Sequence, residues 1–115
     1  MTVRSDKDLR LHRLFLRALS NETRLRILDL LRTGTRNVSQ ISEDLGYEQS
    51  RVSHNLRCLL TCGFVEMKQV GRARVYALTP TTTLPLLDLI ARHVVEYGGR
   101  LRGCETLTQA RKIHA

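Results

Sequence analysis

The sequence has no long apolar run, and its N-terminal segment lacks the apolar stretch of a signal peptide. We therefore expect a cytoplasmic protein without a membrane-spanning helix. Cysteine is scarce: three residues at uneven spacing favour reduced thiols over a disulfide framework. Internal repeats and low-complexity segments are also missing, so the 115 residues predict one domain with one modest core.

The usual signatures of enzyme active sites are absent as well. No paired carboxylate, glycine-rich phosphate loop or Cys-x-x-Cys pair supports an enzyme. His54 precedes Cys58 by four residues, as a base beside a thiol nucleophile would, but nothing else in the sequence completes such a site. We therefore expect no enzymatic activity.

Acidic residues are few relative to basic ones. Eleven Asp and Glu against 19 Lys and Arg give a formal net charge of +8. Such an excess favours a polyanionic partner, with nucleic acid first. An anionic membrane is the alternative, but no segment combines a basic face with the bulky apolar face that an interfacial helix needs. We therefore predict that the protein binds double-stranded DNA and no membrane.

Hydrophobic periodicity and capping residues predict five helices and one hairpin. Apolar residues at helical spacing indicate a first helix, 9–19, and Asn21 can cap a second, 22–32. A capping box opens a third helix at Asn37, which ends at Gly46. The remaining elements are a fourth helix, a hairpin and a last helix at 49–62, 64–79 and 83–97.

Two short helices joined by a tight turn and followed by a hairpin are typical of a winged helix-turn-helix. The expected fold class is therefore mainly α with a small β-hairpin. The last helix is apolar on more than one side, which at the edge of a small domain usually requires a second chain. We expect a homodimer in which residues 1–97 form the DNA-binding and dimerisation domain. Residues 98–115 then form a glycine-broken tail that carries Cys104.

In a helix-turn-helix the second helix enters the major groove and presents its N-terminal residues to the bases. Amide, hydroxyl, imidazole and guanidinium side chains occur there, all able to contact bases or phosphates: Gln49, Ser50, Arg51, Ser53, His54 and Arg57. The hairpin adds three cations for phosphates or the minor groove, Lys68, Arg72 and Arg74. A merely solvated surface, or a protein–protein adaptor built on this fold, would leave these side chains and the net charge unexplained.

Several segments resemble the ArsR/SmtB family of winged-helix repressors. They are ALSNETRLRILDLL, ISEDLGYEQSRVSHNLRCL, CGFV and GRARVYAL, within residues 9–79. The resemblance implies a homodimer formed through the first and last helices, which binds a palindromic operator. It also implies release from DNA when an inducer, often a metal ion, binds. One departure is Glu48, where the family more often has a Ser or Thr cap, because a carboxylate there suits the helix dipole but repels phosphate.

Two metal sites of that family are incomplete in this chain. The third helix reads TRNVSQI and lacks a cysteine pair, and the last helix keeps only His93 and Glu96 of a carboxylate–histidine site. Cys58 and Cys62 remain, four residues apart and off the predicted core stripe of the fourth helix. Their Cβ atoms would lie about 5–6 Å apart, so both thiolates can converge on one ion. The alternative is that both are small, half-buried packing residues. The predicted core stripe is Val52, Leu56, Leu59 and Leu60.

The segment CLLTCG resembles the cadmium- and lead-sensing CmtR-type branch of the family, in which a C-terminal cysteine joins the pair. That resemblance implies Cys104 as the third ligand. From the tail Cys104 could reach the fourth helix of its own chain or, as we expect, that of the second copy. Three thiolates without imidazole favour soft ions, and cadmium(II), lead(II), mercury(II) and arsenic(III) all qualify. The resemblance implies cadmium(II) or lead(II) first. Zinc(II) needs a fourth ligand, for which His114, His54 and water are candidates. Arg51 and Arg57 are expected to lower the thiol pKa values. A switch by thiol oxidation or persulfidation, without metal, stays open as the alternative.

Overall fold

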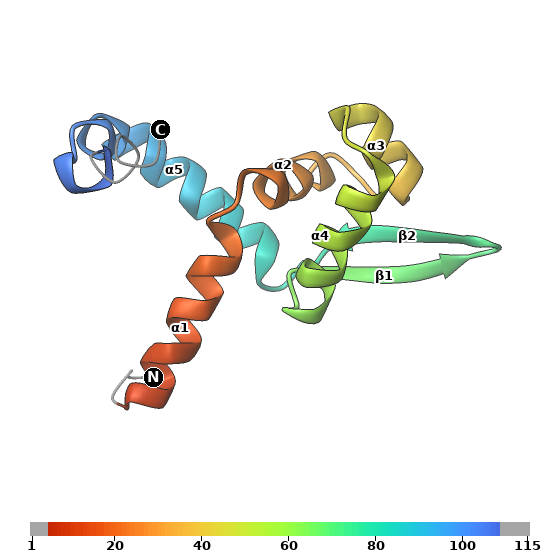
Figure 1. Ribbon diagram of the computed structural model, residues 1–115, viewed down its shortest axis with the longest axis horizontal. Coiled ribbons are helices and arrows are strands. Elements are labelled where there is room, and N and C mark those ends of the chain that lie inside the picture. Colours follow the sequence, from red (N-terminus) through yellow and green to blue (C-terminus); the bar gives the residue numbers. More distant parts are fainter. Residues whose placement is uncertain (1–4, 109–115) are drawn as a thin grey trace.

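The computed structural model describes residues 5–108, which fold into helices and one two-stranded antiparallel sheet (Figure 1). The order of elements confirms the predicted winged helix-turn-helix, mainly α with one small hairpin. In sequence order the elements are α1 (Asp6–Leu19), α2 (Glu22–Leu31), α3 (Val38–Leu45), α4 (Gln49–Thr61), β1 (Val65–Val70), β2 (Ala73–Leu78) and α5 (Thr83–Arg102).

The starts of α1, α2 and α3 follow local capping chemistry. Asn37 and Gln40 form the predicted capping box at α3, each side chain accepting a hydrogen bond from the other residue's backbone N–H. Asn21 caps α2 by accepting from the backbone N–H of Arg24. The first helix begins at Asp6 rather than at residue 9, because Ser5 supplies a cap that hydrophobic periodicity does not reveal.

The core lies where α2, α3 and α4 meet the base of the hairpin. Its members with almost no exposed surface are Ile27, Leu28, Ile41, Val52, Leu56 and Leu59. Leu60, a member of the predicted core stripe, is instead 38% exposed. Asn55 on α4 is buried, only 7% exposed, and both the oxygen and the nitrogen of its side-chain amide are hydrogen-bonded. A buried amide is tolerated when its donors and acceptors are satisfied.

The predicted hairpin forms and closes around a two-residue loop. β1 pairs with β2 from Val65 opposite Leu78 to Val70 opposite Ala73. Gly71 adopts a φ of 63° in the loop, a conformation that favours glycine. Val65 and Leu78 are buried in the core and anchor the base of the hairpin.

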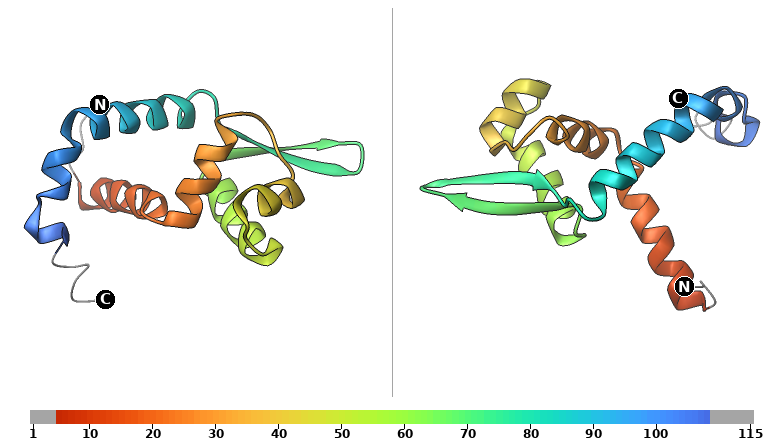
Figure 2. Two further views of the ribbon diagram at one scale, coloured as in Figure 1. Left: turned by 90° about the horizontal axis from the view of Figure 1, so that it is seen from above. Right: turned by 180° about the vertical axis from the view of Figure 1, so that it is seen from behind.

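The last helix is longer than the sequence predicts. It continues from Tyr97 through Gly98 and Gly99 to Arg102, so the backbone does not break at the two glycines. Glycine lowers helix propensity by about 1 kcal/mol but does not forbid the helix, and neither residue has a positive φ. Figure 2 shows α1 and α5 leaving the body of the molecule while the hairpin projects from its other end.

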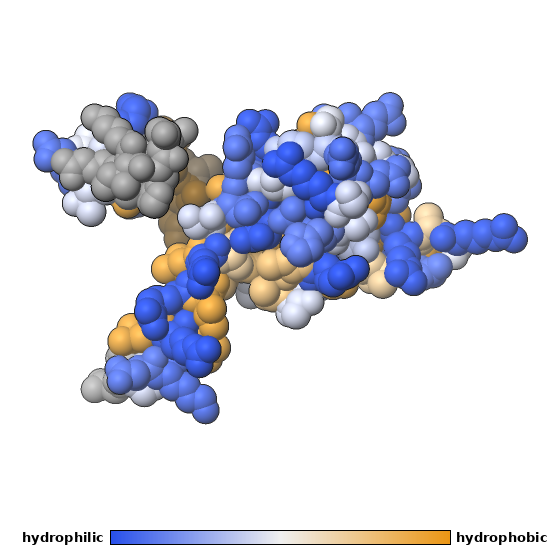
Figure 3. All heavy atoms as spheres, viewed as in Figure 1, coloured by the Kyte–Doolittle hydropathy of each residue, from blue (hydrophilic) through white to orange (hydrophobic). Residues whose placement is uncertain are grey.

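The apolar faces of α1 and α5 are uncovered in the single chain. On α1 only Ala18 and Leu19 are buried, whereas Leu11 is 60% exposed. On α5, Val95 is 87% exposed and Leu89 57% exposed. Figure 3 shows the apolar side chains on α1 beside strongly hydrophilic ones. Helices within residues 5–108 are too short or too polar to cross a membrane.

Candidate DNA-reading helix and thiol site

Helix α4 presents three different faces. Val52, Leu56 and Leu59 are buried against the core. At 3.6 residues per turn, Ser50, His54 and Arg57 share a second face, and all three are exposed. A third face carries four polar or sulfur-bearing side chains at spacings of three and four residues: Arg51, Asn55, Cys58 and Cys62.

The exposed face contains most of the residues predicted to contact DNA. Gln49 lies at the first position of α4, and its amide donates to the hydroxyl of Ser39 on α3 at 3.3 Å. Ser53 is half-buried, whereas Ser50, His54 and Arg57 are exposed. The arrangement keeps polar groups on the outer side of the N-terminal two turns, where a major-groove helix makes its base contacts.

Arg51 is separated from the other predicted DNA contacts. Its Nη2 donates to the hydroxyl of Thr23 on α2 at 2.6 Å, and its Nε donates to the same oxygen at 3.1 Å. The guanidinium carbon also lies 3.9 Å from the ring centroid of Tyr47. In this arrangement Arg51 holds α4 against α2 and against the turn that precedes α4. The base contact predicted for Arg51 would require these interactions to break.

The hairpin cations point in different directions. In the observed register Lys68 pairs with Val75 and Gln69 with Arg74. Since neighbouring residues of a strand face opposite sides, Lys68 and Arg74 project from opposite faces of the hairpin. Arg72 lies in the loop at its tip and is exposed. A hairpin of this kind can place positive charge on both sides of a groove.

Glu48 stands at the N-cap of α4 and makes no side-chain capping bond. The first backbone N–H groups of α4 therefore have no side-chain acceptor from the cap residue.

Cys58 and Cys62 are close neighbours at the C-terminal end of α4. Cys58 is half-buried and Cys62 exposed, and the two residues stand four apart, one helical turn from each other. Partial burial, followed by the neighbouring Cys58, raises the pKa of the Cys62 thiol, while the positive charge of Arg24 opposes the rise. The expectation that Arg51 and Arg57 lower this pKa is therefore wrong, because burial and the second thiol outweigh the surrounding cations.

A hollow of about 370 Å³ adjoins Cys62. It lies between α1, the end of α4 and the start of α5, and its walls are largely apolar. Within it the rings of Phe15 and Phe64 pack with centroids 5.1 Å apart. The hollow is lined by Phe15, Cys62, Gly63, Phe64, Thr82, Thr83 and Leu86.

Cys104 lies apart from the thiol pair. It is half-buried just beyond α5 and lines a different hollow of about 510 Å³, beside His93, Tyr97 and Arg100. Within residues 5–108 of one chain, no group of three His, Cys, Asp or Glu side chains could hold a metal ion. The pair itself fits a soft ion, because two thiols adjoin on one helix face. A third donor has to come from a residue other than Cys58 and Cys62. One candidate, His114, lies outside the described residues.

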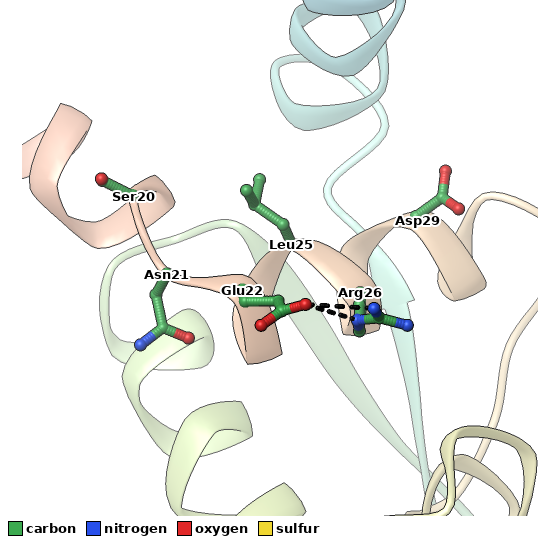
Figure 4. A pocket seen from close by; sticks show the side chains of 6 residues that line it. All are labelled: Ser20, Asn21, Glu22, Leu25, Arg26 and Asp29. Atoms are coloured by element: carbon green, nitrogen blue, oxygen red, sulfur yellow. Dashed lines mark hydrogen bonds and ion pairs between the residues drawn. The ribbon is translucent and has the colours of Figure 1, made fainter. Parts of the chain in front are cut away.

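A further hollow, of about 710 Å³, lies along the first turns of α2 (Figure 4). Its charged side chains are partly committed to each other, since Arg26 donates to Glu22 at 3.0 Å. It contains no thiol and no imidazole, so it offers nothing to a soft metal. Its lining residues are Ser20, Asn21, Glu22, Leu25, Arg26 and Asp29.

Comparison with known proteins places this architecture in a family. A profile described as "Bacterial regulatory protein, arsR family" matches residues 21–67. The HTH-type transcriptional regulator Rv0081 of Mycobacterium tuberculosis is 34% identical over 82 residues, 70% of this chain and 71% of the relative. Its crystal structure superposes with a TM-score of 0.75 at 30% identity, covering 87% of this chain and all of that one. The chain belongs to the ArsR family.

Other members match over less of their length. The transcriptional regulator NmtR of M. tuberculosis is 44% identical over 78 residues, 68% of this chain and 65% of the relative. A probable mercury resistance operon repressor of Streptomyces lividans is 38% identical over 64 residues, 56% of this chain and 51% of the relative. CmtR of M. tuberculosis is 44% identical over 62 residues, 54% of this chain and 52% of the relative. The chain thus spans between about half and two thirds of these three ArsR relatives.

One solved relative is informative about assembly, and the relatives together are informative about enzymatic activity. The winged helix-turn-helix domain of Mb0332 from Mycobacterium bovis, described as homodimeric, superposes with a TM-score of 0.71 at 31% identity, covering 84% of this chain and 92% of that one. The family and these relatives are DNA-binding transcriptional regulators, in agreement with the expectation that the chain is no enzyme.

The sequence did not predict the side-chain hydrogen bonds that connect α2 and α4. Thr23 and Asn55 are 6% and 7% exposed, and Arg24 is half-buried beside them. Their side chains link α1, α2 and α4. The only sequence signal is that these polar residues lie at helical spacing with buried apolar ones, and polar residues at such positions usually face solvent.

Proposed function

We propose that the protein is a homodimeric transcriptional repressor that leaves its operator when a soft heavy-metal ion, cadmium(II) or lead(II), binds cysteine thiolates. The observation that carries the proposal is the pair of neighbouring thiols, Cys58 and Cys62, on the helix whose other exposed face suits base reading. The bacterial cytoplasm, where operator DNA lies, is the corresponding location.

Dimerisation is supported by the uncovered apolar faces of α1 and α5. Large apolar side chains on these two projecting helices are exposed by 37% (Ile90) to 87% (Val95), which is costly in water, at roughly 25 cal/mol for each Å² left exposed. The named homodimer among the structural relatives superposes over 84% of this chain. A second copy of the chain is the partner that would cover both faces at once, and it would place two α4 helices for two half-sites of an operator.

Replacing Val95, 87% exposed on α5, by aspartate is expected to convert the dimer into monomers. The carboxylate would be buried without a partner in the interface, which raises the dimer dissociation constant by about a hundredfold or more. Sedimentation at several protein concentrations measures the change. The matched control is Val70→Asp, at an exposed position on the hairpin (60%), which should stay dimeric. A dimeric Val95→Asp protein would place the interface elsewhere.

The metal would be held by Cys58 and Cys62 of one chain and by Cys104, which in this structure lies away from its own chain's pair. The apolar hollow beside Cys62 opens between α1 and α5, next to the faces that a second copy would cover. A C-terminal segment entering there from the second copy would bring its Cys104 toward the pair. Thiolates alone favour soft ions, and the relative named as a mercury resistance operon repressor supports a soft metal as inducer.

The raised pKa of Cys62 favours metal over oxidation as the signal. Oxidants react with thiolates, so a protonated thiol is a poor redox sensor. A metal ion displaces the proton itself and binds a thiol of high pKa once the pH permits. The redox switch stays the second candidate, and a response to peroxide that chelators do not affect would support it.

Cadmium affinity is expected to rise with pH. Since the pKa of Cys62 lies above its ordinary value, the thiol stays protonated at neutral pH, and each proton displaced by the metal adds about a tenfold gain in affinity per pH unit. The gain should end once the pH exceeds the raised pKa of Cys62. Competition with a chelator of known affinity between pH 6 and 9 measures the slope. A pH-independent affinity would show that Cys62 is not a ligand.

The proposal is tested with reduced, metal-free protein and a fluorescent duplex from upstream of its own gene. Anisotropy at one stated salt concentration gives the dissociation constant with and without stoichiometric cadmium(II). We expect cadmium to weaken binding at least fivefold and a chelator to restore it, since allosteric couplings are typically about 5–150-fold. Tight binding that is indifferent to cadmium(II), lead(II) and mercury(II) would contradict metal sensing.

A further inference from the structure

Arg24 on α2 connects α1 with α4 through one guanidinium. Its Nε donates to the backbone oxygen of Ala18 in the last turn of α1, at 2.6 Å, and its Nη1 donates to Oδ1 of Asn55 on α4, at 3.3 Å. A guanidinium is planar, and its N–H groups point in fixed directions. The two hydrogen bonds therefore define the direction of α1 relative to α4.

The α4 end of this connection is buried and hydrogen-bonded to its surroundings. Asn55 is 7% exposed, and its Nδ2 donates to the backbone oxygen of Arg51, at 2.9 Å. Arg51 in turn donates to the hydroxyl of Thr23, which is 6% exposed and precedes Arg24 in the sequence. A buried acceptor that loses its donor is unfavourable. Oδ1 of Asn55 therefore favours the placement of α4 at which the guanidinium reaches it.

Helix α1 is attached to the rest of the molecule near its C-terminal end. Among its residues only Ala18 and Leu19 are buried, and the ring of Phe15 packs against that of Phe64 with centroids 5.1 Å apart. The N-terminal part of α1 projects away from the body of the molecule (Figure 2). Apolar contacts tolerate a small rotation, whereas hydrogen bonds are directional. The angle at which α1 leaves the body therefore depends on Arg24.

A small change of this angle has a large effect on the position of α4 in a dimer. A helix of 14 residues is about 21 Å long, so a rotation of about 10° at one end displaces the other end by about 3.6 Å. Successive base pairs of DNA are about 3.4 Å apart. In a dimer that is held together along α1, such a rotation would move each α4 by about one base-pair step.

We propose that Arg24 is a positioning residue that sets the separation of the two DNA half-sites that the dimer accepts. The inference rests on the homodimer of the proposed function, in which a second copy covers α1, and it does not depend on the metal. The two reading helices of a dimer have to match half-sites that are about 34–36 Å apart, one turn of DNA, or a multiple of that distance. With Arg24 in place one spacing is preferred. Without its hydrogen bonds α1 can rotate, and neighbouring spacings become nearly as favourable.

The test measures DNA affinity by anisotropy on metal-free protein and on duplexes that differ only in the spacing of their half-sites. The set consists of the duplex from upstream of the protein's own gene and of versions with one or two base pairs inserted or removed between its half-sites. We expect the wild type to bind one spacing at least tenfold more tightly than its neighbours. In Arg24→Gln and in Asn55→Ala this ratio should fall to less than a third of the wild-type value. The double variant should lower it no further, because both changes remove the same link.

The ratio between spacings distinguishes positioning from a general loss of stability. A variant that is merely less stable binds every duplex more weakly by the same factor, and such a result would contradict the proposal. Arg26→Gln, on the same helix and paired with Glu22, is the matched control and should keep the wild-type ratio. If Arg24→Gln does not fold, Asn55→Ala and Arg24→Lys, which keeps the charge but lacks the planar fork, carry the comparison.

Sedimentation of the same samples separates the two levels of the proposal. A wild-type protein that binds DNA as a monomer would overturn the proposed dimer and the inference together. A wild-type dimer whose spacing preference is kept by both variants would overturn the role of Arg24 alone. Metal sensing is tested separately, by the response to cadmium(II), because the measurements on this set of duplexes contain no metal.

Discussion

Replacing Cys58 and Cys62 together by serine is expected to abolish the response to cadmium(II) while DNA binding remains. The serine hydroxyl keeps the size of the side chain but stays protonated, and it is a hard donor that soft ions do not prefer. Loss of an outer-shell partner already costs about 10–100-fold in metal affinity, so losing two ligands should cost far more than a hundredfold. Titration by thiolate–metal absorption and anisotropy on the same sample measures both effects.

The side of α4 that carries the thiols makes this a clean experiment. Cys58 is half-buried and Cys62 exposed, so their replacement leaves the core residues Val52, Leu56 and Leu59 in place. Cys104→Ser is the companion variant, expected to weaken cadmium binding while the pair still binds one ion. A double serine variant that is still released from DNA by cadmium would place the sensor elsewhere in the chain.

Replacing Arg57 by alanine is expected to cost about 1–3 kcal/mol of operator binding and to relax sequence preference at one base pair. Arg57 lies on the exposed face of α4 with Ser50 and His54, where a guanidinium can bind guanine through two hydrogen bonds. Anisotropy against the operator and against single-base variants of it measures the loss. An equal loss on operator and unrelated DNA would assign Arg57 to the phosphates.

Arg72→Ala provides the contrasting case at the tip of the hairpin. A phosphate contact carries no sequence information, so its loss should weaken all duplexes alike and reduce the slope of log affinity against log salt by about 0.9. Arg26→Ala serves as the control of equal charge change, because Arg26 lies on α2 and pairs with Glu22. Unchanged affinity in Arg72→Ala would remove the hairpin from the DNA interface.

The helices and the hairpin could be predicted because their signals are local. Asn37 with Gln40 and the turn glycine Gly71 act within a few residues of the backbone they shape. The errors occurred where local signals were weak. Ser5 extended α1 by three residues, and Gly98 and Gly99 were interpreted as a break although α5 runs through them to Arg102. Glycine lowers the stability of a helix, but the helical residues before and after it can offset that loss.

The sequence predicted the individual residues of the candidate site, but it did not predict which neighbours from other helices surround them. The spacing of Cys58 and Cys62 places them on one helix face in any α-helix, and the structure agrees. Whether Arg51 points to DNA or to Thr23, and whether the Cys62 pKa rises or falls, depends on burial and on neighbours from α1 and α2. Those neighbours are distant in sequence, so no local pattern encodes them.

The sequence by itself determined the family, the winged helix-turn-helix and the spacing of the thiol pair on α4, because periodicity, capping and motif spacing are properties of contiguous residues. The tertiary structure alone decided which polar residues are buried and what they hold. It placed Arg24 between Ala18 and Asn55, left the apolar faces of α1 and α5 uncovered, and separated Cys104 from the other two thiols within one chain. Such contacts join residues far apart along the chain, and they follow from how whole helices pack rather than from any one segment.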